Sequence, residues 1–346
     1  MDQKNFTKAA IFTTALLLIG IICWEMYLRN AGNTISYDDG AALWSDKRDD
    51  VYKKDATVFI GSSRIKYDLD IETWESMTGE EAVQLAMEGT SPRPILENLA
   101  NDDDFNGRLI IDVTEVLFFS KSPGRQFEVT ANLDFYKNNH TPAQKASFAL
   151  NNSLESKLVF LDKTSFSLAA LLDKIKLPPR PGVFGPPAFP VDFNRVTEDR
   201  QSYMTDRFLV NATMTNQVKA IWAAMGKRGE PPPKGDTLTD ILQEVKQNID
   251  KIKARGGTVL FVRTPSSGPF RDAENMGFPR EGYWEQLLAY TQTPGIHYMD
   301  YPPIANFQCP EFSHLSKSDA VIFTREFVKI LQSEMNWGFS SKQNAL

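Results

Sequence analysis

The feature that most constrains the fold of this chain is an apolar segment close to its N-terminus. Residues 9–24 read AAIFTTALLLIGIICW without a charged side chain, and only Glu25 interrupts the run before it ends at Leu28. A helix over residues 9–28 matches the ~20 residues that cross the hydrocarbon core of a bilayer. No other stretch of the sequence approaches this length. We therefore expect a single transmembrane anchor, with the folded part of the protein built from the rest of the chain.

A cleaved signal peptide is the alternative interpretation of this segment. Cleavage needs small side chains in an A-x-A-like pattern just before the cut, whereas residues 27–30 read YLRN. Trp24 and Tyr27 stand at one end of the segment, where aromatic rings favour the interface between lipid and water. These residues favour an uncleaved anchor.

The charges on either side of the segment predict its orientation. Lys4 and Lys8 precede it, whereas Arg29 follows it before an acidic pair at residues 38 and 39. The positive-inside rule favours a cytoplasmic N-terminus, residues 1–8, with the rest of the chain outside the cytoplasm.

Composition excludes several classes of function. The 38 Lys and Arg against 44 Asp and Glu give a net charge of −6, whereas a protein that binds nucleic-acid phosphates usually has a basic domain. With only Cys23 and Cys309, we expect no disulfide and no metal site rich in cysteine. We also expect no cofactor. The 3 histidines are His140, expected at the surface, His297, inside a predicted strand, and His314.

Short apolar runs alternate with amphipathic stretches in the rest of the sequence. The run ATVFIG ends in glycine and is typical of a buried strand, and residues 237–254 have apolar side chains three and four apart, as a helix does. Strands that alternate with helices predict a parallel sheet with helices on both faces. The predicted strands are residues 56–61, 81–86, 108–114, 258–264 and 295–301, and residues 320–331 belong to a last amphipathic helix.

The domain organisation follows from this alternation. Residues 29–55 are polar and form a candidate stalk, and the α/β domain comprises residues 56–119 and 236–335. Residues 120–235 are helix-like in part and rich in proline elsewhere, and they are inserted at the edge of the sheet where ligands bind. We interpret the insertion as a cap over a substrate, and residues 336–346 as a C-terminal tail.

A glycine–serine turn, Gly61-Ser62-Ser63-Arg64, follows the first predicted strand. Such a turn holds a serine hydroxyl at the carboxyl edge of the sheet, where backbone N–H groups face a developing oxyanion. The same residues are also common in turns that have no catalytic role, so the turn alone does not identify a reaction.

A second motif, PEFSHLS at residues 310–316, precedes the last predicted helix. A serine nucleophile needs a base that takes its proton, and the base needs an acceptor that fixes its tautomer. Glu311 and His314, three residues apart, supply both.

Together these motifs resemble those of the SGNH/GDSL hydrolase superfamily, in which Gly-Asp-Ser follows the first strand and Asp-x-x-His precedes the last helix. The resemblance, over residues 56–115 and 256–335, makes Ser63 the nucleophile, His314 the base and Glu311 its orienting acid. Residues 84–89, QLAMEG, look like the family's second block, so Gly89 joins the Ser63 N–H in the oxyanion hole. The family's fold is a flavodoxin-like three-layer α/β/α sandwich with a parallel sheet.

The chain departs from the family's pattern at three places. Ser62 replaces the Asp of the first motif, Glu311 replaces the Asp of the last, and residues 112–115, DVTE, lack the Asn of the third block. One oxyanion donor, worth ~10²–10³ in rate, is therefore missing. Whether the variant triad is active is left open by the sequence.

A Gly-Ser-Ser-Arg variant behind an N-terminal anchor looks most like a bacterial cell-envelope subgroup of this family, similar to D-alanine transfer and alginate O-acetylation proteins. The resemblance implies an extracytoplasmic serine acyl-ester hydrolase or O-acyltransferase at the bacterial inner membrane. Its substrate would be an acylated glycan or an acyl donor, and a membrane-bound O-acyltransferase is a candidate partner. Arg64 and Arg263 are candidate substrate-binding residues, although Arg64 alternatively pairs with an acidic side chain.

Two other functions remain open at the level of sequence. The chain is alternatively a catalytically weak adaptor subunit of a membrane-bound O-acyltransferase or a polysaccharide-export complex. It is alternatively a glycan-binding module that stacks sugars on aromatic residues of the insertion, such as Phe184, Phe189, Phe193 and Tyr203.

Overall fold

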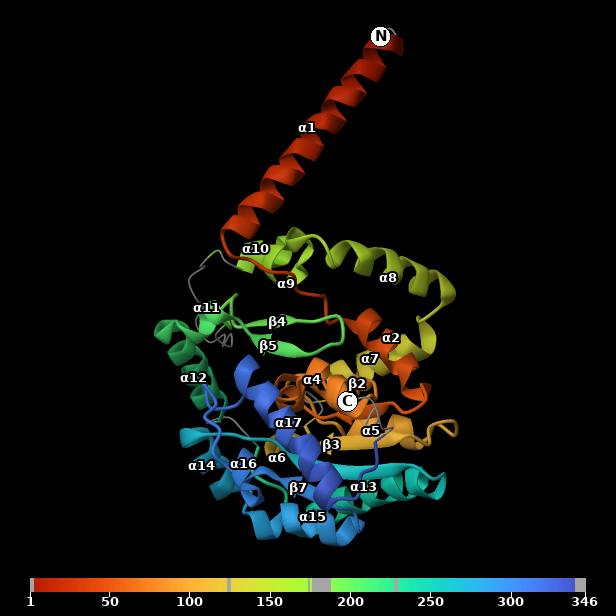
Figure 1. Ribbon diagram of the computed structural model, residues 1–346, viewed down its shortest axis with the longest axis vertical. Helices are drawn as coiled ribbons and strands as arrows, with labels where there is room; N and C mark the ends of the chain where they lie inside the picture. The colour runs from red at the N-terminus through yellow and green to blue at the C-terminus, as the bar shows by residue number, and fades with distance from the viewer. Residues whose placement is uncertain (1–2, 123–125, 174, 176–187, 227–229, 340–346) are drawn as a thin grey trace, which may run out of the picture. The chain divides into compact units, whose positions relative to one another are not determined.

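The computed structural model describes residues 3–122, 126–173, 175, 188–226 and 230–339 (Figure 1). The chain divides into two compact units. Unit 1 comprises residues 1–38 and 146–184, and unit 2 comprises residues 39–145 and 185–346. The predicted insertion is therefore divided, because part of it clusters with the N-terminal segment and the rest belongs to the α/β unit.

The sheet of unit 2 is parallel, so the carboxyl ends of its strands meet at one edge. Within the described residues it has five strands in the order β2-β1-β3-β6-β7. Thr57 of β1 pairs with Ala82 on one side and with Arg108 on the other. The predicted strands and their parallel arrangement are confirmed, with these bounds: β1 (Thr57–Ile60), β2 (Ala82–Gln84), β3 (Arg108–Asp112), β6 (Thr258–Arg263) and β7 (Gly295–His297).

Helices cover both faces of the sheet, which explains why the strand residues are apolar at consecutive positions. Val58 and Ile60 belong to one apolar cluster, whereas Phe59 belongs to another on the opposite face. The first cluster includes residues of α5 (Arg93–Ala100), α13 (Asp236–Ala254) and α15 (Trp284–Thr291). The second includes residues of α3 (Ser63–Asp68), α4 (Ile71–Thr78) and α17 (Lys317–Glu334). Helices α13 and α17 confirm the two predicted amphipathic helices.

Part of the predicted insertion packs directly on α3. Tyr67 of α3 forms a small apolar cluster with insertion residues that include Phe193, Met204 and Phe208. These come from an antiparallel strand pair and the helices beside it. Other elements of unit 2 are α6 (Glu115–Phe118), α7 (Phe127–Asn138), β4 (Asn194–Val196), β5 (Ser202–Met204), α11 (Asp206–Leu209), α12 (Ala212–Gly226), α14 (Gly268–Gly277) and α16 (Pro302–Ala305).

Residues 41–52 belong to unit 2 and do not form a stalk. They form α2 (Ala41–Asp49) and a short 3-10 helix, Asp50–Tyr52. Trp44 is fully buried in the main apolar cluster, and its indole N–H donates to the Leu85 carbonyl at 3.1 Å. The stalk predicted for residues 29–55 is therefore wrong over this part, because a few apolar side chains among many charged ones are enough to hold a short helix on the core.

Unit 1 contains α1 (Gln3–Asn30), the one helix among the described residues that is long and apolar enough to cross a membrane. It includes the predicted span, residues 9–28, and continues beyond both ends of it. The other elements are the second half of α8 (Pro142–Glu155), which begins in unit 2, a 3-10 helix, Val159–Leu161, α9 (Lys163–Phe166) and α10 (Leu168–Asp173).

The burial of Trp44 predicts the effect of truncating it. Trp44→Ala removes a large core side chain, so we expect the free energy of unfolding to fall by ~3–5 kcal/mol in urea denaturation. Lys54→Ala, an exposed residue of the same segment, is the matched control and should change stability by less than ~0.5 kcal/mol. Similar small effects for both variants would mean that α2 contributes little to the core.

Candidate functional site

The carboxyl ends of β1 and β3 lie next to each other where the strand order changes direction, and ligands of open parallel sheets bind at such a point. The Ser62 and Thr114 hydroxyls, each in the loop that follows one of these strands, are hydrogen-bonded at 2.8 Å. Thr114 in turn donates to Asp112 at 3.0 Å, as does Thr264 beyond the end of β6. One buried carboxylate thus joins three strand ends.

Gly61 is required at this point by close packing. A Cβ at Gly61 would lie 2.6 Å from the Asp112 Cβ and 2.7 Å from the Ile65 Cγ2. Any side chain here would push the serine turn away from β3.

Burial raises the pKa of Asp112 above its ordinary value, and the nearby Arg64 and Arg263 offset only part of this effect.

Helix α3 and the loop before α17 are joined by three contacts in register. Each contact pairs a residue of α3 with a residue of the loop: Arg64 Nε donates to the Ser313 hydroxyl at 3.5 Å, the Tyr67 ring stacks on the His314 imidazole with centroids 4.3 Å apart, and Asp68 Oδ1 accepts from the Leu315 N–H at 2.9 Å. The two motifs singled out in the sequence therefore lie side by side.

Ser63 is the first residue of α3 and is half-buried. It stands four residues before Tyr67, so both side chains project from the same face of the helix. Because Tyr67 stacks on His314, this is the face of α3 that is turned toward the imidazole. Among the described residues, His314 Nε2 is buried without a hydrogen-bond partner.

Glu311 holds His314 through two contacts to one carboxylate oxygen. Its Oε1 accepts from the His314 backbone N–H at 2.7 Å and lies 2.8 Å from the imidazole Nδ1. The other oxygen, Oε2, accepts from the indole N–H of Trp222 in α12. A carboxylate at Nδ1 favours a proton on that nitrogen, which leaves Nε2 as the basic one.

The turn between Glu311 and His314 is held in a rare backbone conformation. Phe312 has a φ of 81°, a region that residues other than glycine seldom adopt. Its N–H donates to the Cys309 carbonyl and its carbonyl accepts from the Ser267 N–H, both at 3.0 Å. The Lys219 ammonium lies 4.5 Å from the centre of its ring. Such strain persists where surrounding contacts impose it, and it concentrates at functional sites.

Aromatic side chains cover the imidazole of His314, which is 1% exposed. The ring centroids of Phe193 and Trp222 lie 6.3 and 6.0 Å from that of His314. Both residues come from the part of the predicted insertion that belongs to unit 2. The imidazole is therefore closed to solvent in this structure.

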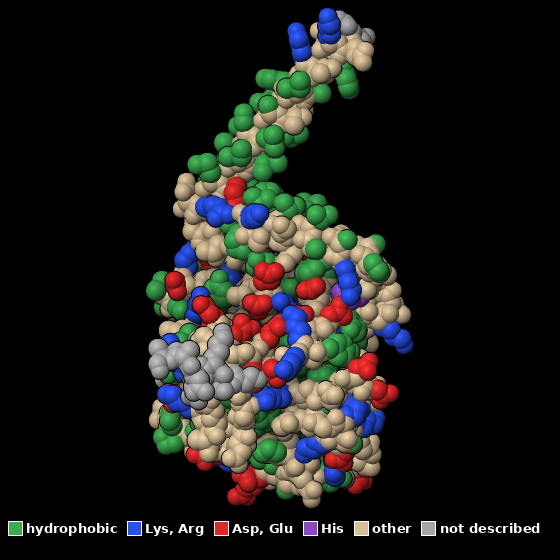
Figure 2. Space-filling model, turned by 45° about the vertical axis from the view of Figure 1, so that its right-hand side comes forward, with side chains coloured by type: hydrophobic (Ala, Val, Ile, Leu, Met, Phe, Trp, Pro, Cys, Tyr) green, Lys and Arg blue, Asp and Glu red, His purple; other side chains and the backbone are tan. Residues whose placement is uncertain are grey.

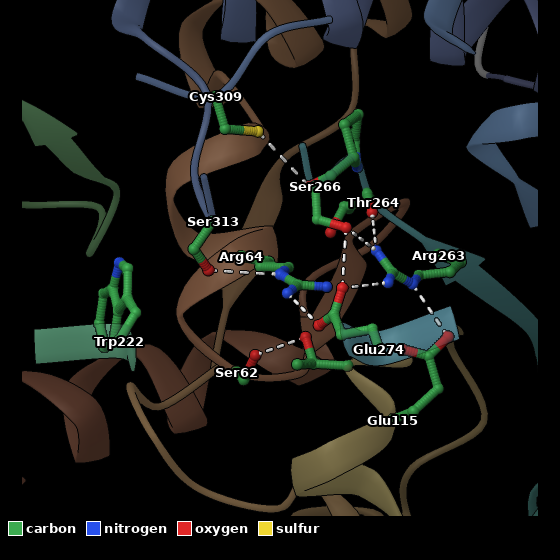
Figure 3. Close-up of polar contacts among 12 residues, drawn as sticks. Ser62, Arg64, Glu115, Trp222, Arg263, Thr264, Ser266, Glu274, Cys309 and Ser313 are labelled. Carbon is green, nitrogen blue, oxygen red and sulfur yellow. Dashed lines mark hydrogen bonds and ion pairs between the residues drawn. The ribbon is translucent and has the colours of Figure 1, made fainter. Parts of the chain in front are cut away.

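A buried network of four charged side chains lies beside the serine turn. Figure 3 shows Glu274 of α14 between two guanidinium groups: one oxygen pairs with Arg64 and the other with Arg263 at 2.7 Å. Arg263 also pairs with Glu115 at 2.9 Å. Burial alone would raise the pKa of Glu274, but Arg64 and Arg263 overcome this effect and lower it to about 2.

These pairings bear on the two arginines expected to bind substrate. Arg64 and Arg263 are 1% and 2% exposed, and each is neutralised by a buried carboxylate. In this structure they join the ends of β1 and β6 to α14, which favours a structural role. The pairing of Arg64 with an acidic side chain agrees with the alternative drawn from the sequence, and substrate binding by either arginine stays a prediction.

Gly89 lies in an exposed turn after β2, with a positive φ of 69°. The turn is tied to the serine loop because the Met87 N–H donates to the Gly61 carbonyl at 3.3 Å. The predicted oxyanion partner is thus held at the same edge of the sheet as Ser63, and its role in an oxyanion hole stays a prediction.

The other histidines lie apart from these contacts. His297 is buried, and burial together with Arg263 and Arg280 lowers its pKa to about 3. The side chain of His140 is only 6% exposed and lies 3.0 Å from Asp49, so the expectation that it lies at the surface is wrong. Of the aromatic residues considered for sugar stacking, Phe184 lies outside the described residues. No group of acidic, His and Cys side chains in the described ranges could hold a metal ion.

No protein-family model matches the sequence, and no curated protein matches it either.

Sequence reasoning missed Trp222, Tyr67 and Glu274, which all shape the site. Trp222 reaches Glu311 from 89 residues away, and Glu274 reaches Arg64 from 210 residues away. Of the three, Tyr67 was the easiest to predict from the sequence, because it follows Ser63 by four residues and so shares one face of a short helix with it.

Because Glu274 pairs with both Arg64 and Arg263, its removal should lower the stability of the protein. Glu274→Gln leaves two buried guanidinium groups without their common partner, so we expect the free energy of unfolding at pH 7 to fall by ~3–5 kcal/mol. In the unmodified protein, the stabilisation from this ionised carboxyl is complete above its unfolded pKa of 4.5 and is lost as pH falls toward 2. The variant should lack this part of the acid dependence.

Urea denaturation at pH 7 and between pH 5 and 2.5 measures both effects. Asp250→Asn is the control, because Asp250 forms an exposed pair with Lys246 and should contribute less than ~0.5 kcal/mol. Equal losses in the two variants would contradict the role assigned to Glu274.

Proposed function

We propose that this protein is a serine acyl-ester hydrolase or O-acyltransferase of the SGNH type, with Ser63 as nucleophile, His314 as base and Glu311 as its orienting acid. The observation that carries the proposal is the junction of α3 with residues 313–315. Ser63 stands one helical turn before Tyr67, whose ring stacks on the imidazole, and Glu311 lies 2.8 Å from Nδ1. Among the described residues Nε2 has no hydrogen-bond partner, the Ser63 hydroxyl included.

The reaction would proceed in two half-reactions. His314 Nε2 takes the proton of the Ser63 hydroxyl as Oγ attacks the acyl carbonyl carbon, and the same proton passes to the departing alcohol oxygen when its bond to that carbon breaks. A sugar hydroxyl or water then gives its proton to Nε2 and attacks the acyl-serine, and Ser63 recovers its proton. The backbone N–H groups of Ser63 and Gly89 would hold the oxyanion in both steps.

The architecture supports this proposal at the level of fold. Counted along the chain, the five strands of the described sheet run in the order 2-1-3-4-5, which is the flavodoxin-like order. Helices on both faces make three layers, as in an SGNH-type sandwich. The serine turn and the third-strand loop meet at the point of the sheet where ligands bind.

The N-terminal helix supports a place at a membrane. A single span with a cytoplasmic N-terminus would hold the catalytic unit outside the cytoplasm, at the bacterial inner membrane. Anchoring beside a membrane-bound O-acyltransferase would raise the effective concentration of acyl donor and glycan acceptor, which favours transfer over hydrolysis.

A specific observation favours the adaptor as second candidate. The Ser62 and Thr114 hydroxyls bond to each other, and Thr114 also donates to Asp112, so neither hydroxyl replaces the missing Asn donor of the third block. His314 is also covered by aromatic rings. A weak enzyme that opens only on its partner would have these properties.

The pair of adjacent serines provides the test of the nucleophile. We expect Ser63→Ala to abolish covalent labelling by a fluorophosphonate and to lower turnover of an activated aryl acetate by at least ~10³-fold. Ser62→Ala is the matched control in the same turn and should keep its labelling, because its hydroxyl is engaged with Thr114. Thermal unfolding of both variants checks that the fold is retained.

The outcomes separate the candidates. Unchanged turnover in a folded Ser63→Ala, or labelling that depends on Ser62, would remove the proposed mechanism. Full complementation of cells by Ser63→Ala, together with co-purification of a multi-pass membrane protein, would favour the adaptor.

Trp222 is a candidate positioning residue, because its indole N–H binds Glu311 and so acts on His314 indirectly. Trp222→Phe keeps an aromatic ring but removes the N–H donated to Oε2. A hydrogen bond to a charged group is worth ~1.5–3 kcal/mol, so we expect turnover and the rate of fluorophosphonate labelling to fall together by ~10–100-fold. Phe189→Leu, which alters a ring 5.3 Å from Trp222 without that bond, is the control. Equal effects of the two changes would assign Trp222 to packing alone.

A further inference from the structure

Unit 1 exposes leucines on two helices, α8 and α10, which precede and follow the segment bound to the N-terminal helix. Leu150 and Leu154 of α8 are four residues apart and share one face, and they are 72% and 53% exposed. The helix α10 exposes a similar face, which consists of Leu168, Leu171 and Leu172. We call these five side chains the leucine patch. Large apolar side chains that are exposed to solvent on a shared helix face are typical of a surface that contacts protein or membrane.

The chain between the two helices is fixed to the end of α1. The carboxylate of Glu25 accepts from the N–H groups of Val159 and Phe160 at 3.0 and 3.1 Å. The Arg29 guanidinium, one turn further along α1, donates to the Lys157 carbonyl at 2.6 Å. Residues 157–160 are therefore held at the last turns of the anchor.

Aromatic residues indicate the depth at which residues 157–160 would lie relative to a bilayer. Trp24 stacks on Tyr27 with centroids 5.6 Å apart, and both rings are exposed at the end of the apolar span, as interfacial aromatics are. Phe166 lies edge-on to Trp24 at 6.5 Å. Phe160 lines a hollow along the apolar side of α1 with Leu16, Leu17, Gly20, Ile21 and Trp24. The connecting segment thus lies against the span itself.

The leucine patch begins only a few residues from these fixed points. Leu154 precedes the Lys157 contact by three residues, and Leu168 follows Phe166 by two. Because a helix rises about 1.5 Å per residue and an extended chain about 3.3 Å, even Leu150 lies within roughly 20 Å of the bonds to Glu25. Figure 2 shows hydrophobic side chains along the length of α1.

We propose that the leucine patch is a second membrane contact, inserted in the interface of the same leaflet that α1 leaves. Its occupant is lipid: acyl chains meet the leucines, and a headgroup meets the exposed Lys157, because Arg29 is already paired with Glu25 and Lys163 with Asp38. The inference rests on the membrane anchor proposed above and is independent of the catalytic activity. A single transmembrane helix does not restrict the orientation of the unit attached to it. A second membrane contact next to that helix would restrict the orientation of unit 1 relative to the bilayer.

Lipid is favoured over a protein partner by continuity with the span. The patch adjoins a helix that is itself unburied along its apolar length, through a segment that the helix binds by hydrogen bonds. A bilayer that surrounds α1 therefore extends to the neighbouring leucines. Five leucines near the interface bury apolar area there without any further partner.

Site-directed fluorescence in nanodiscs tests the proposal on the full chain. Cys23→Ser removes the exposed native thiol, whereas Cys309 is buried. A bimane label is then placed singly through Leu154→Cys and Leu171→Cys in the patch, Leu17→Cys in the span and Met276→Cys in α14. Met276 is 82% exposed in unit 2 and serves as the matched aqueous control. Quenching by lipids with doxyl-labelled chains is compared with quenching by iodide in water.

We expect both patch labels to resemble the Leu17 label, with quenching by doxyl lipid several-fold greater than that of the Met276 label and with protection from iodide. Patch labels that follow Met276 while the Leu17 label stays in lipid would overturn the inference and leave the anchor standing. Quenching of the Leu17 label by iodide would contradict both the membrane anchor and the membrane contact of the leucine patch. Patch labels quenched by neither reagent would show that protein covers the leucines, and lipid would be excluded as their occupant.

Discussion

The hydrogen bond between the Asp68 carboxyl and the Leu315 N–H is the interaction on which the candidate site depends. It joins the helix after the first strand to the loop before the last helix, 247 residues apart in sequence. Asp68 is fully buried, and burial raises its pKa well above the ordinary value. A neutral carboxyl is less unfavourable to bury than an anion, so the rise in pKa reduces the free-energy cost of placing this group in the core.

The same edge of the sheet contains other buried carboxylates, and their surroundings differ. Asp112 is bound by two threonine hydroxyls, whereas Glu274 is bound by two guanidinium groups that keep it ionised. Glu311 accepts from an imidazole, a backbone N–H and an indole. Each group has at least one partner from a remote part of the chain, and these bonds tie the loops near Ser63 to the rest of unit 2.

Some of these features were predictable because they are local in sequence. Strands buried on both faces give short continuous apolar runs, so residues 108–112 could be read directly as a strand. Glu311 and His314 are three residues apart, so one turn brings them together. The folded part of the predicted stalk could not be read in this way, because the burial of Trp44 depends on core residues that follow much later.

The sequence by itself determined the alternation of strands and helices, the apolar span and the acid–histidine pair, because each depends on neighbours within a few residues. Only the tertiary structure decided which charges are neutralised. The sequence leaves open whether Arg64 binds substrate or pairs with an acidic side chain, and the structure pairs it with Glu274, 210 residues away. Burial and charge pairing depend on contacts between remote segments, and no local pattern of side chains records those contacts.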